Sequence, residues 1–494
     1  MLARVRTFTL VGVEARPVWV EADVARGLPA FSLVGLPDTA VRESRERVRA
    51  AIANSGFEFP LRRITVSLAP ADVPKAGPAL DLAIAAAVLA ASGQVPEGSL
   101  DGGAVAGELG LDGSVRPVAG ALAMAEGARN AGSDSLTVAS ADAGDATLVD
   151  GLRIVPVQSL GELVALASGE AEPRDPDPPR ERGDHQPEPD LVDLRGQPVM
   201  RRGLEIAAAG GHHLLVTGPP GSGKSLALRR LPGLLPPLAP DERLEVARIA
   251  GIRGRSPVAG RRPFRAPHHS VSRAGLLGGG SPPRPGEITL AHRGVLFLDE
   301  LAEFPRATLE ALRQPLEEGT IRIARARHTV TLPCRFQLAA AANPCPCGHG
   351  DSDPRCRCAP VAVERYRTRL SAALADRIDI QLAIGQPSAS GMAGEAGEGS
   401  VAVCERTTRA RERAMQRAGH ANADIDTAGV RRLVLTQDAQ DLVERSQRLH
   451  GLSGRGHDRL LRVARTIADL AAAEEVEADH VAEALALRRR GGDR

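Results

Sequence analysis

The stretch from His213 to Ser225 reads HLLVTGPPGSGKS and decides the fold of the chain around it. Leu214–Thr217 is typical of a short buried strand, and Leu226–Leu231 predicts a helix after it. The residues between them fit the pattern G-x-x-x-x-G-K-[ST], whose backbone N–H groups cradle phosphate oxygens at a helix N-terminus. The residues expected to bind a nucleotide are Gly218, Pro219, Pro220, Gly221, Ser222, Gly223, Lys224 and Ser225. Lys224 is expected to reach the β- and γ-phosphates of ATP, and Ser225 to hold Mg²⁺.

Two later strands end in polar residues that would complete such a site. Val295–Leu298 is an apolar run followed by Asp299 and Glu300. Asp299 is expected to bind the Mg²⁺ of the nucleotide, and Glu300 to orient and deprotonate an attacking water. A second apolar run, Ala339–Ala342, ends at Asn343. This residue either holds that water against the γ-phosphate or begins a turn before a proline.

The composition bounds the class of protein. A length of 494 residues suggests two to four domains, and 43% hydrophobic with 25% charged residues is ordinary for a globular chain. No apolar run reaches 18 residues and Met1–Thr9 lacks a signal-peptide core, so we expect a cytoplasmic protein without membrane contact. The net charge of +1 and the 2% aromatic content exclude a global basic signature and a large base-stacking platform. Lys75 and Lys224 are the only lysines.

Composition shifts predict five segments. Residues 1–168 mix strands and helices, including a helix over Thr39–Ser55 capped by Asp38. Residues 169–190 are rich in proline and mixed charge and predict a disordered linker. The ATPase core is expected over 191–385, a flexible linker over 386–400, and a helical lid over 401–494. The predicted class is therefore α/β, with a phosphate-loop core, an α-helical lid and a preceding α+β domain.

The N-terminal domain carries a motif without its chemistry. The sequence PKAGPA, which ends at Ala79, resembles the nucleophile loop of Lon-type proteases, P-K-D-G-P-S. Ala79 occupies the serine position of that loop, and Leu122 occupies the position of the catalytic lysine. A Ser/Lys dyad needs a hydroxyl and a base, so the resemblance implies a Lon-like (ribosomal protein S5 domain 2-type) fold without peptidase activity. Lys75 is either a leftover loop residue or a contact to phosphate.

Two segments of the core are expected to be functional loops. Thr320–Leu332 alternates in the β manner and predicts a hairpin with a basic tip. The arginines of this hairpin are Arg322, Arg325 and Arg327. Residues 261–287, with the adjacent His268 and His269, form an insertion that is long for a structureless loop, and such insertions tend to carry function.

Four cysteines form two C-x-C pairs. They are Cys345, Cys347, Cys356 and Cys358. Four thiolates can bind a structural zinc ion tetrahedrally, and His349 could substitute for one of them. The alternative is a set of reduced thiols that pack a loop. Four protein ligands leave no open position, so a catalytic metal is not expected.

Arginines in the second half of the chain are candidates for contacts to the nucleotide. Arg377 lies between two acidic residues before an apolar strand. It either pairs internally or projects to the γ-phosphate of a neighbouring subunit as an arginine finger. Arg455 is a candidate lid arginine, with Arg459 as the fallback, although a solvated arginine face would look the same in sequence.

The motif order resembles the YifB/ComM family of magnesium-chelatase-like AAA+ ATPases. The stretches LEIAAAGGHHLLVTGPPGSGKS and FRAPHHSVSRAGLLGGG are similar to that family specifically, as are FLDE, AANPCPCG and DRIDI. The resemblance implies an ATP-driven hexameric ring that moves on branched or duplex DNA without sequence preference, as in branch migration. Ser371, Ala372 and Ala373 depart from the family pattern S-G-P in the turn before Arg377.

Three other functions remain open from the sequence. A magnesium-chelatase-type motor subunit has a similar ATPase core, although it has no need of a Lon-like domain. A regulatory ATPase that remodels proteins would carry the same nucleotide motifs. An ATP-dependent protease is disfavoured by Ala79 and Leu122.

Overall fold

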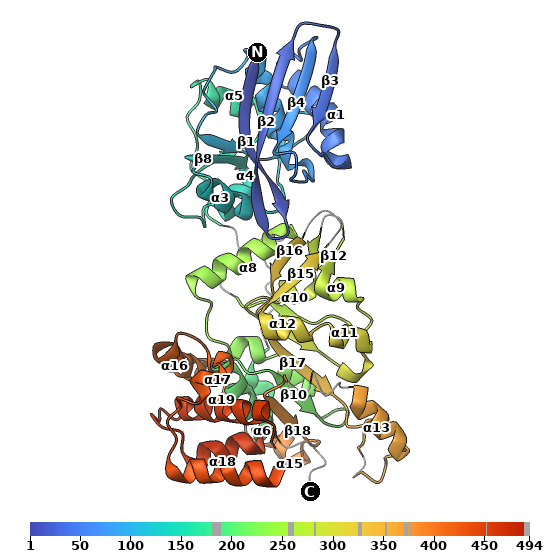
Figure 1. Ribbon diagram of the computed structural model, residues 1–494, viewed down its shortest axis with the longest axis vertical. Coiled ribbons are helices and arrows are strands. Elements are labelled where there is room, and N and C mark those ends of the chain that lie inside the picture. The colour runs from blue at the N-terminus through green and yellow to red at the C-terminus, as the bar shows by residue number, and fades with distance from the viewer. Residues whose placement is uncertain are drawn as a thin grey trace.

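The chain is described by a computed structural model over residues 1–179, 189–254, 261–280, 283–324, 329–350, 353–369, 374, 377–450 and 452–488. Its elements follow one long axis in three parts, which are an N-terminal sheet with helices, a central sheet and a group of C-terminal helices (Figure 1). None of the helices within these ranges is long and apolar enough to cross a membrane.

A seven-stranded mixed sheet forms the N-terminal part, in the order β3-β4-β2-β1-β5-β8-β9. Its strands are β1 (Leu2–Val11), β2 (Glu14–Ala25), β3 (Ala30–Val34), β4 (Arg63–Ala69), β5 (Gly103–Val105), β8 (Ser135–Ala139) and β9 (Arg153–Val157). The short strands β6 (Glu108–Leu109) and β7 (Val115–Arg116) pair with each other. The helices of this part are α1 (Thr39–Asn54), α2 (Asp81–Ala91), α3 (Ala121–Asn130), α4 (Ser140–Ala146) and α5 (Leu160–Ala167).

Local sequence explains most of these elements. The carboxylate of Asp38 accepts a hydrogen bond of 2.8 Å from the Val41 N–H, which confirms the predicted cap of α1. Nearly every residue of α2 is buried, in agreement with its uniformly apolar sequence. The sequence did not predict β1, which pairs with β2 along its whole length. The polar and apolar residues of β1 do not alternate clearly, so the sequence carries no strand pattern there. The strand forms because pairing with β2 satisfies its backbone hydrogen-bonding groups.

The central sheet has five parallel strands in the order β11-β14-β17-β10-β18. They are β10 (Leu214–Thr217), β11 (Phe264–Arg265), β14 (Val295–Leu298), β17 (Gln337–Ala342) and β18 (Ile380–Ala383). The predicted bounds of β10 and β14 are confirmed, and β17 begins two residues before the expected strand. All-parallel strands are buried on both faces, and for that reason they read as continuous apolar runs in the sequence.

The insertion over 261–287 is not a structureless loop. It contributes β11 to the edge of the sheet and also contains α9 (Arg273–Leu277) and a ribbon of β12 (Gly278–Gly279) and β13 (Arg284–Pro285). α10 (Glu287–Leu290) follows it. The predicted hairpin is present as β15 (Thr320–Ala324) and β16 (Thr329–Pro333). Its expected tip arginines, Arg325 and Arg327, lie outside the described residues.

The remaining core helices are short. They are α6 (Pro198–Gly210), α7 (Lys224–Leu228), α8 (Pro240–Ile252), α11 (Arg306–Glu310), α12 (Arg313–Glu318) and α13 (Pro360–Arg369). α7 begins two residues before the predicted helix and ends at Leu228. A 3₁₀ turn over Leu231–Leu234 follows, so the predicted end at Leu231 is wrong.

The C-terminal part is helical, as expected. Its helices are α16 (Ser400–Ala418), α17 (Thr427–Val430), α18 (Gln437–His450), α19 (Gly454–Leu470) and α20 (Ala478–Ala486). Leu204 of α6, Val216 of β10 and Leu460 of α19 belong to one buried hydrophobic cluster. The C-terminal helices therefore share a core with one face of the central sheet.

The two predicted linkers differ in structure. The segment 386–400, predicted to be a flexible linker, contains α15 (Ala389–Ala393), and a Cβ on Gly196 would lie 2.9 Å from the carbonyl carbon of Gly391. Of the linker over 169–190, residues 180–188 are outside the described ranges. The part up to residue 179 has neither helix nor strand, and its Pro178 lies against Gly144.

The N-terminal part rests on the central part where β1 and β2 reach α8 and the β15–β16 hairpin (Figure 1), and the contacts there include an ion pair and an apolar cluster. Glu126 of α3 forms an ion pair of 3.1 Å with Arg248 of α8. Val13, in the turn between β1 and β2, joins the same hydrophobic cluster as Val330 and Leu332 of β16. One side of the hairpin is therefore covered by the N-terminal part.

Candidate functional site

Three neighbouring strands of the central sheet place the predicted nucleotide-binding residues at one edge. β17 pairs in parallel with β10 on one side and β14 on the other. The phosphate loop follows β10, Asn343 follows β17, and Asp299 and Glu300 follow β14. Because parallel strands end at the same edge, residues that are far apart in sequence meet there. Open α/β sheets bind ligands at this position.

The phosphate loop is shaped by glycines with unusual backbone geometry. Gly221 and Gly223 have φ values of +76° and +84°, a region that side chains with a Cβ avoid. A Cβ on Gly218 would lie 2.6 Å from the carbonyl oxygen of Ile384, so only glycine fits there. The Ser222 hydroxyl donates a 2.8 Å hydrogen bond to the Pro219 carbonyl and closes the turn.

Lys224 is buried at the centre of this arrangement. Its Nζ donates hydrogen bonds of 2.7 Å to the Gly218 carbonyl, 2.8 Å to the Pro219 carbonyl and 3.2 Å to Oδ1 of Asn343. Desolvation lowers the pKa of Lys224, while the carboxylates of Asp299 and Glu300 raise it. These contacts join the phosphate loop directly to the end of β17.

The acidic pair is held in a strained turn. Glu300 has a φ of +50°, which is uncommon for a residue with a side chain. Its N–H donates a 3.0 Å hydrogen bond to Oδ1 of Asp299. The Glu300 side chain is 59% exposed, and its Oε2 lies 3.8 Å from Nδ1 of His269. The turn therefore presents a reachable carboxylate, as a general base requires.

His269 was not assigned to this site from the sequence. In the sequence it is only one of two adjacent histidines in the insertion. The centroid of its ring lies 4.0 Å from that of His268, with the two ring planes tilted by 35°. The adjacent histidines were a visible signal, but nothing in the sequence placed the insertion beside β14.

Two further residues support the site without a clear sequence signal. The side-chain amide of Gln197 donates to the carbonyls of Ser222 at 3.2 Å and Gly385 at 3.1 Å, which ties the phosphate loop to the segment after β18. Tyr366 is buried, which raises the pKa of its hydroxyl to about 12, and the Asn343 backbone partly offsets that rise. Isolated polar residues of this kind carry no recognisable pattern.

Arg377 pairs internally within the single chain. It is buried, and its guanidinium forms an ion pair with Oε1 of Glu317 in α12. The structure thus shows the internal pair, which was one of the two alternatives from the sequence. Ser371, Ala372 and Ala373 lie outside the described residues.

The two lid candidates differ in exposure. Arg455 lies in the first turn of α19 and is exposed. The fallback Arg459 is buried, with Nε 3.6 Å from Oδ1 of Asp379. Asp379 in turn approaches the His212 ring at 3.4 Å. Arg459 is therefore part of a buried polar group where the strands β10 and β18 begin. Of the two candidates, only Arg455 is exposed to solvent.

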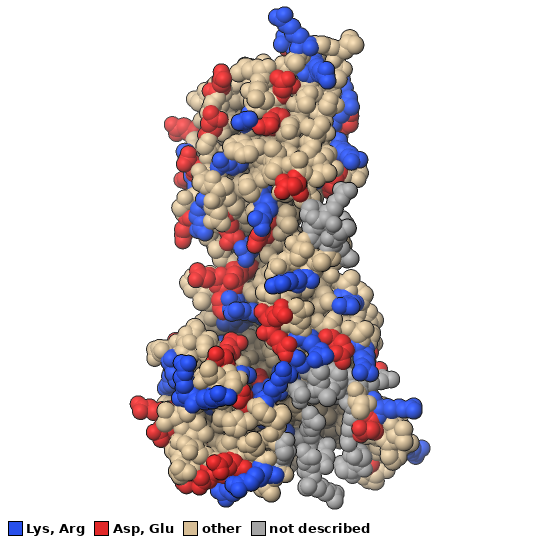
Figure 2. Space-filling view, viewed as in Figure 1, with Lys and Arg blue, Asp and Glu red and all other residues tan. Residues whose placement is uncertain are grey.

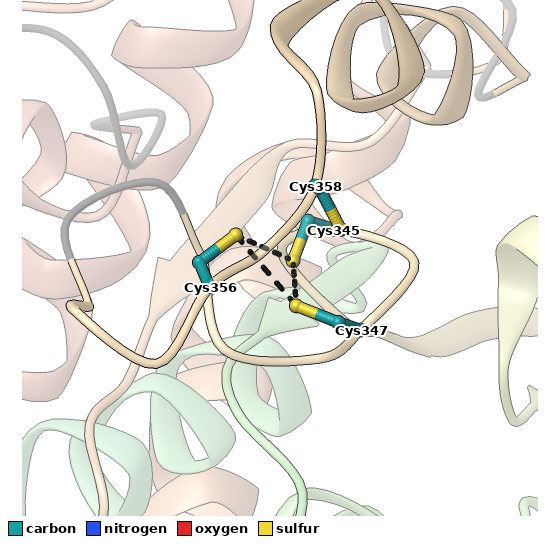
Figure 3. Close-up of side chains that lie close together, drawn as sticks. All are labelled: Cys345, Cys347, Cys356 and Cys358. Carbon is teal, nitrogen blue, oxygen red and sulfur yellow. Dashed lines mark hydrogen bonds between the residues drawn. The ribbon is translucent and has the colours of Figure 1, made fainter.

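All four cysteines of the predicted metal site come together (Figure 3). Their four sulfur atoms all lie within 4.8 Å of one another, and none of these cysteines forms a disulfide. The members are Cys345, Cys347, Cys356 and Cys358. His349 is not one of the group, and its Nδ1 lies 3.8 Å from the carboxylate of Asp353.

The N-terminal domain has no comparable site at the positions of the protease motif. Ala79 and Leu122 are buried in the same hydrophobic cluster. Lys75 is fully buried, and its ammonium donates to the carbonyl of Pro70. Desolvation lowers the pKa of Lys75. The alternative that Lys75 contacts phosphate is therefore wrong, because the ammonium is enclosed by the protein.

The chain is similar to known proteins along nearly its whole length. Three family models match, described as "Magnesium chelatase, subunit ChlI" over 190–392, "Subunit ChlI of Mg-chelatase" over 20–142, and "Magnesium chelatase, subunit ChlI C-terminal" over 397–488. The uncharacterized proteins YifB of Salmonella typhimurium and of Escherichia coli are each 43% identical over 99% of this chain and 97% of their own. Competence protein ComM of Haemophilus influenzae is 40% identical over 99% of this chain and 97% of its own.

Proposed function

Because this chain belongs to the magnesium-chelatase-like AAA+ family that includes YifB and ComM, we propose that it is an ATP-hydrolysing motor that moves DNA as a homo-hexameric ring. The observation that carries the ATPase part is the meeting of Lys224 and Asn343 at 3.2 Å, with Asp299 and Glu300 on the next strand. Family membership and this sheet edge support the same reaction.

The residues present fit a nucleotide with Mg²⁺. Gly221 and Gly223 leave the loop free of Cβ atoms where phosphate would approach, and Lys224 is already directed at main-chain carbonyls that a phosphate can replace as its partners. Ser225 and Asp299 offer the oxygen ligands that Mg²⁺ prefers. When bound, Mg·ATP supplies the electrophilic phosphorus and neutralises charge on the phosphate oxygens.

The chain's own groups would then divide the work of hydrolysis. Glu300 accepts the proton of a water molecule, because its carboxylate is exposed and close to the phosphate loop. The Asn343 amide orients that water, and Lys224 balances phosphate charge. His269 lies beside Glu300, with its Nδ1 3.8 Å from Oε2 of that carboxylate.

The DNA part of the proposal rests on two neighbouring ribbons. A Cβ on Gly278 of β12 would lie 3.2 Å from Ile323 of β15, so the insertion and the hairpin are side by side. Exposed arginines lie on both ribbons and on α9, which precedes β12; they are Arg273, Arg284 and Arg322. Acidic and basic side chains are otherwise interspersed on the face shown in Figure 2, so a local patch must supply the phosphate contacts.

The direct test is branch migration of a synthetic four-way junction. The wild type is expected to give ATP-dependent product, and Glu300→Gln none. Absence of product from the wild type would overturn the branch-migration proposal. Such absence together with ATPase activity that no DNA stimulates would favour the second candidate, a metal-chelatase motor, to which the names of the three matched models point.

A triple variant tests the arginine patch. Replacing Arg273, Arg284 and Arg322 by alanine should weaken DNA binding strongly. It should also reduce the slope of log K against log salt by roughly 2.7, since each phosphate contact contributes about 0.9. Alanine at three exposed arginines of the N-terminal domain, Arg62, Arg129 and Arg153, is the matched control. An equal loss in both triples would contradict a local DNA contact.

A mixing experiment tests whether Arg377 completes a neighbour's site. Lys224→Ala chains keep Arg377 but lack a working phosphate loop, and Arg377→Ala chains have the reverse defect. If Arg377 acts between subunits, a mixture should recover part of the ATPase activity that each variant lacks alone. No recovery, with both variants folded and assembled, would leave the Glu317 pair as the role of Arg377.

A further inference from the structure

The four cysteines converge more closely than loop packing requires (Figure 3). The sulfur of Cys345 lies 3.3 Å from that of Cys347 and 3.8 Å from that of Cys356, and Cys347 and Cys356 are 3.6 Å apart. Zinc–sulfur bonds of about 2.3 Å in a tetrahedron would separate the sulfurs by about 3.8 Å. The observed spacing is thus close to that of a zinc tetrathiolate, and far beyond the roughly 2.05 Å of a disulfide.

The loop from Cys345 to Gly350 also has features that suit metal binding. The Gly350 N–H donates a 3.2 Å hydrogen bond to Sγ of Cys345, an interaction that stabilises a thiolate. Gly348 and Gly350 have φ values of +88° and +89°, so the chain can turn tightly around the sulfurs. Cys345 itself is buried, whereas Cys347 is exposed and open to an incoming ion.

This loop touches the nucleotide site at two points. Cys345 follows Asn343 by two residues, and the Asn343 side chain contacts Lys224. A Cβ on Gly348 would lie only 2.7 Å from Cγ of Pro220, so the cysteine loop lies directly on the phosphate loop. After Cys358 the chain leads into α13, whose buried Tyr366 interacts electrostatically with the Asn343 backbone.

We propose that the four cysteines bind one zinc ion, and that the zinc-bound loop holds Pro220 and Asn343 in position for ATP. On binding, each S–H bond is replaced by a zinc–sulfur bond, the four protons pass to solvent, and the zinc ion gives up its bound waters. All four positions are filled by protein, so the ion is structural. Its effect on hydrolysis is exerted through the two contacts with the nucleotide site.

Metal analysis of the purified full-length chain tests the first half. One zinc per chain is expected in the wild type. Fewer than about 0.1 is expected in Cys347→Ser/Cys356→Ser. Cys334→Ser and Cys404→Ser are matched controls, because both thiols lie outside the cluster, and they should keep one zinc. A wild type that folds without zinc, or that shows a disulfide among these cysteines, would overturn the proposal.

A second measurement covers the case in which the double variant does not fold. Titrating the folded wild type with a mercurial thiol reagent should release one zinc, detected with a chromogenic chelator, while circular dichroism reports the fold. Thiol modification without zinc release would contradict the site. Neither measurement uses nucleotide, so their outcome is independent of the proposed ATPase function on which the second half rests.

A pair of glycine variants tests the second half. Gly348→Ala should keep its zinc but raise the KM for ATP about tenfold or more, because the new methyl group meets Pro220. Gly419→Ala is the matched control, because Gly419 also has a positive φ, of +73°, but a Cβ there would meet no atom within 4 Å. An equal KM in both variants would show that the loop does not position the nucleotide site.

Discussion

The two lysines of the chain occupy opposite kinds of environment. Lys224 contacts two carbonyls and the Asn343 amide at an open sheet edge, with two carboxylates nearby that raise its pKa. Lys75 donates to the Pro70 carbonyl and is fully buried. Burial lowers the pKa of both. Both lysines thus carry a desolvated ammonium, but Lys224 lies at an accessible site and Lys75 lies inside a closed loop.

The two regions differ in the chemical groups that surround the ammonium and in how a substrate could reach it. Near Lys75, the two positions of the protease motif are Ala79 and Leu122, which are buried together and carry no polar atom in their side chains. Near Lys224, Glu300 remains 59% exposed. A reactive site needs both a functional group and a path for its substrate, and only the central sheet edge offers both.

The largest effect is expected at Lys224. Lys224→Ala removes the only ammonium at the phosphate loop, and the ATPase rate should fall at least about 100-fold. A coupled-enzyme ATPase assay measures this, with Lys75→Met as the matched lysine control. If both lysine variants lost activity equally while folded, the comparison between the two regions would be wrong.

Glu300→Gln should separate binding from hydrolysis. The amide keeps the shape of the side chain but cannot accept the proton of water, so turnover should fall about 100-fold or more. ATP affinity, measured by isothermal titration calorimetry, should change by less than about threefold. A large loss of affinity with normal turnover would assign Glu300 to nucleotide binding.

Restoring the missing dyad should not create a protease. Leu122→Lys places a charge in an apolar cluster, and an uncompensated buried charge costs roughly 3–5 kcal/mol. Ala79→Ser/Leu122→Lys should therefore lower the melting temperature of the N-terminal domain by about 10 °C. Casein degradation by this variant would show that the N-terminal domain still admits a substrate. Ala79→Ser alone, which adds one hydroxyl, is the control.

The smallest effect is expected at Lys75 and depends on pH. Because folding lowers the pKa of Lys75, the unfolded chain binds more protons between that lowered pKa and the ordinary lysine pKa of 10.5. Wild-type stability should therefore rise with pH in this window, relative to Lys75→Met. Scanning calorimetry at pH 7.5 and pH 10 should show a larger advantage of the wild type at pH 10. An advantage that does not change with pH would mean that Lys75 has the same pKa in both states.

The strand predictions were right where a short apolar run was followed by residues typical of turns. β10 and β14 are short apolar runs that end in turn residues, and their bounds match. Arginine assignments were harder, since Arg377, Arg455 and Arg459 look alike in sequence. Burial against Glu317 or Asp379 separates them, and both partners are supplied by other elements. His269 and Gln197 were missed as site residues for the same reason.

The sequence alone determined the phosphate loop, the acidic pair and the two C-x-C pairs, because each is a local pattern with its own chemistry. Only the tertiary structure decided that Lys75 is enclosed, that Arg377 pairs internally, and that the cysteine loop lies on Pro220. These outcomes depend on strand order and on packing between distant segments. A local pattern specifies which group is present, but neighbours from elsewhere in the chain decide whether water, nucleotide or metal can reach it.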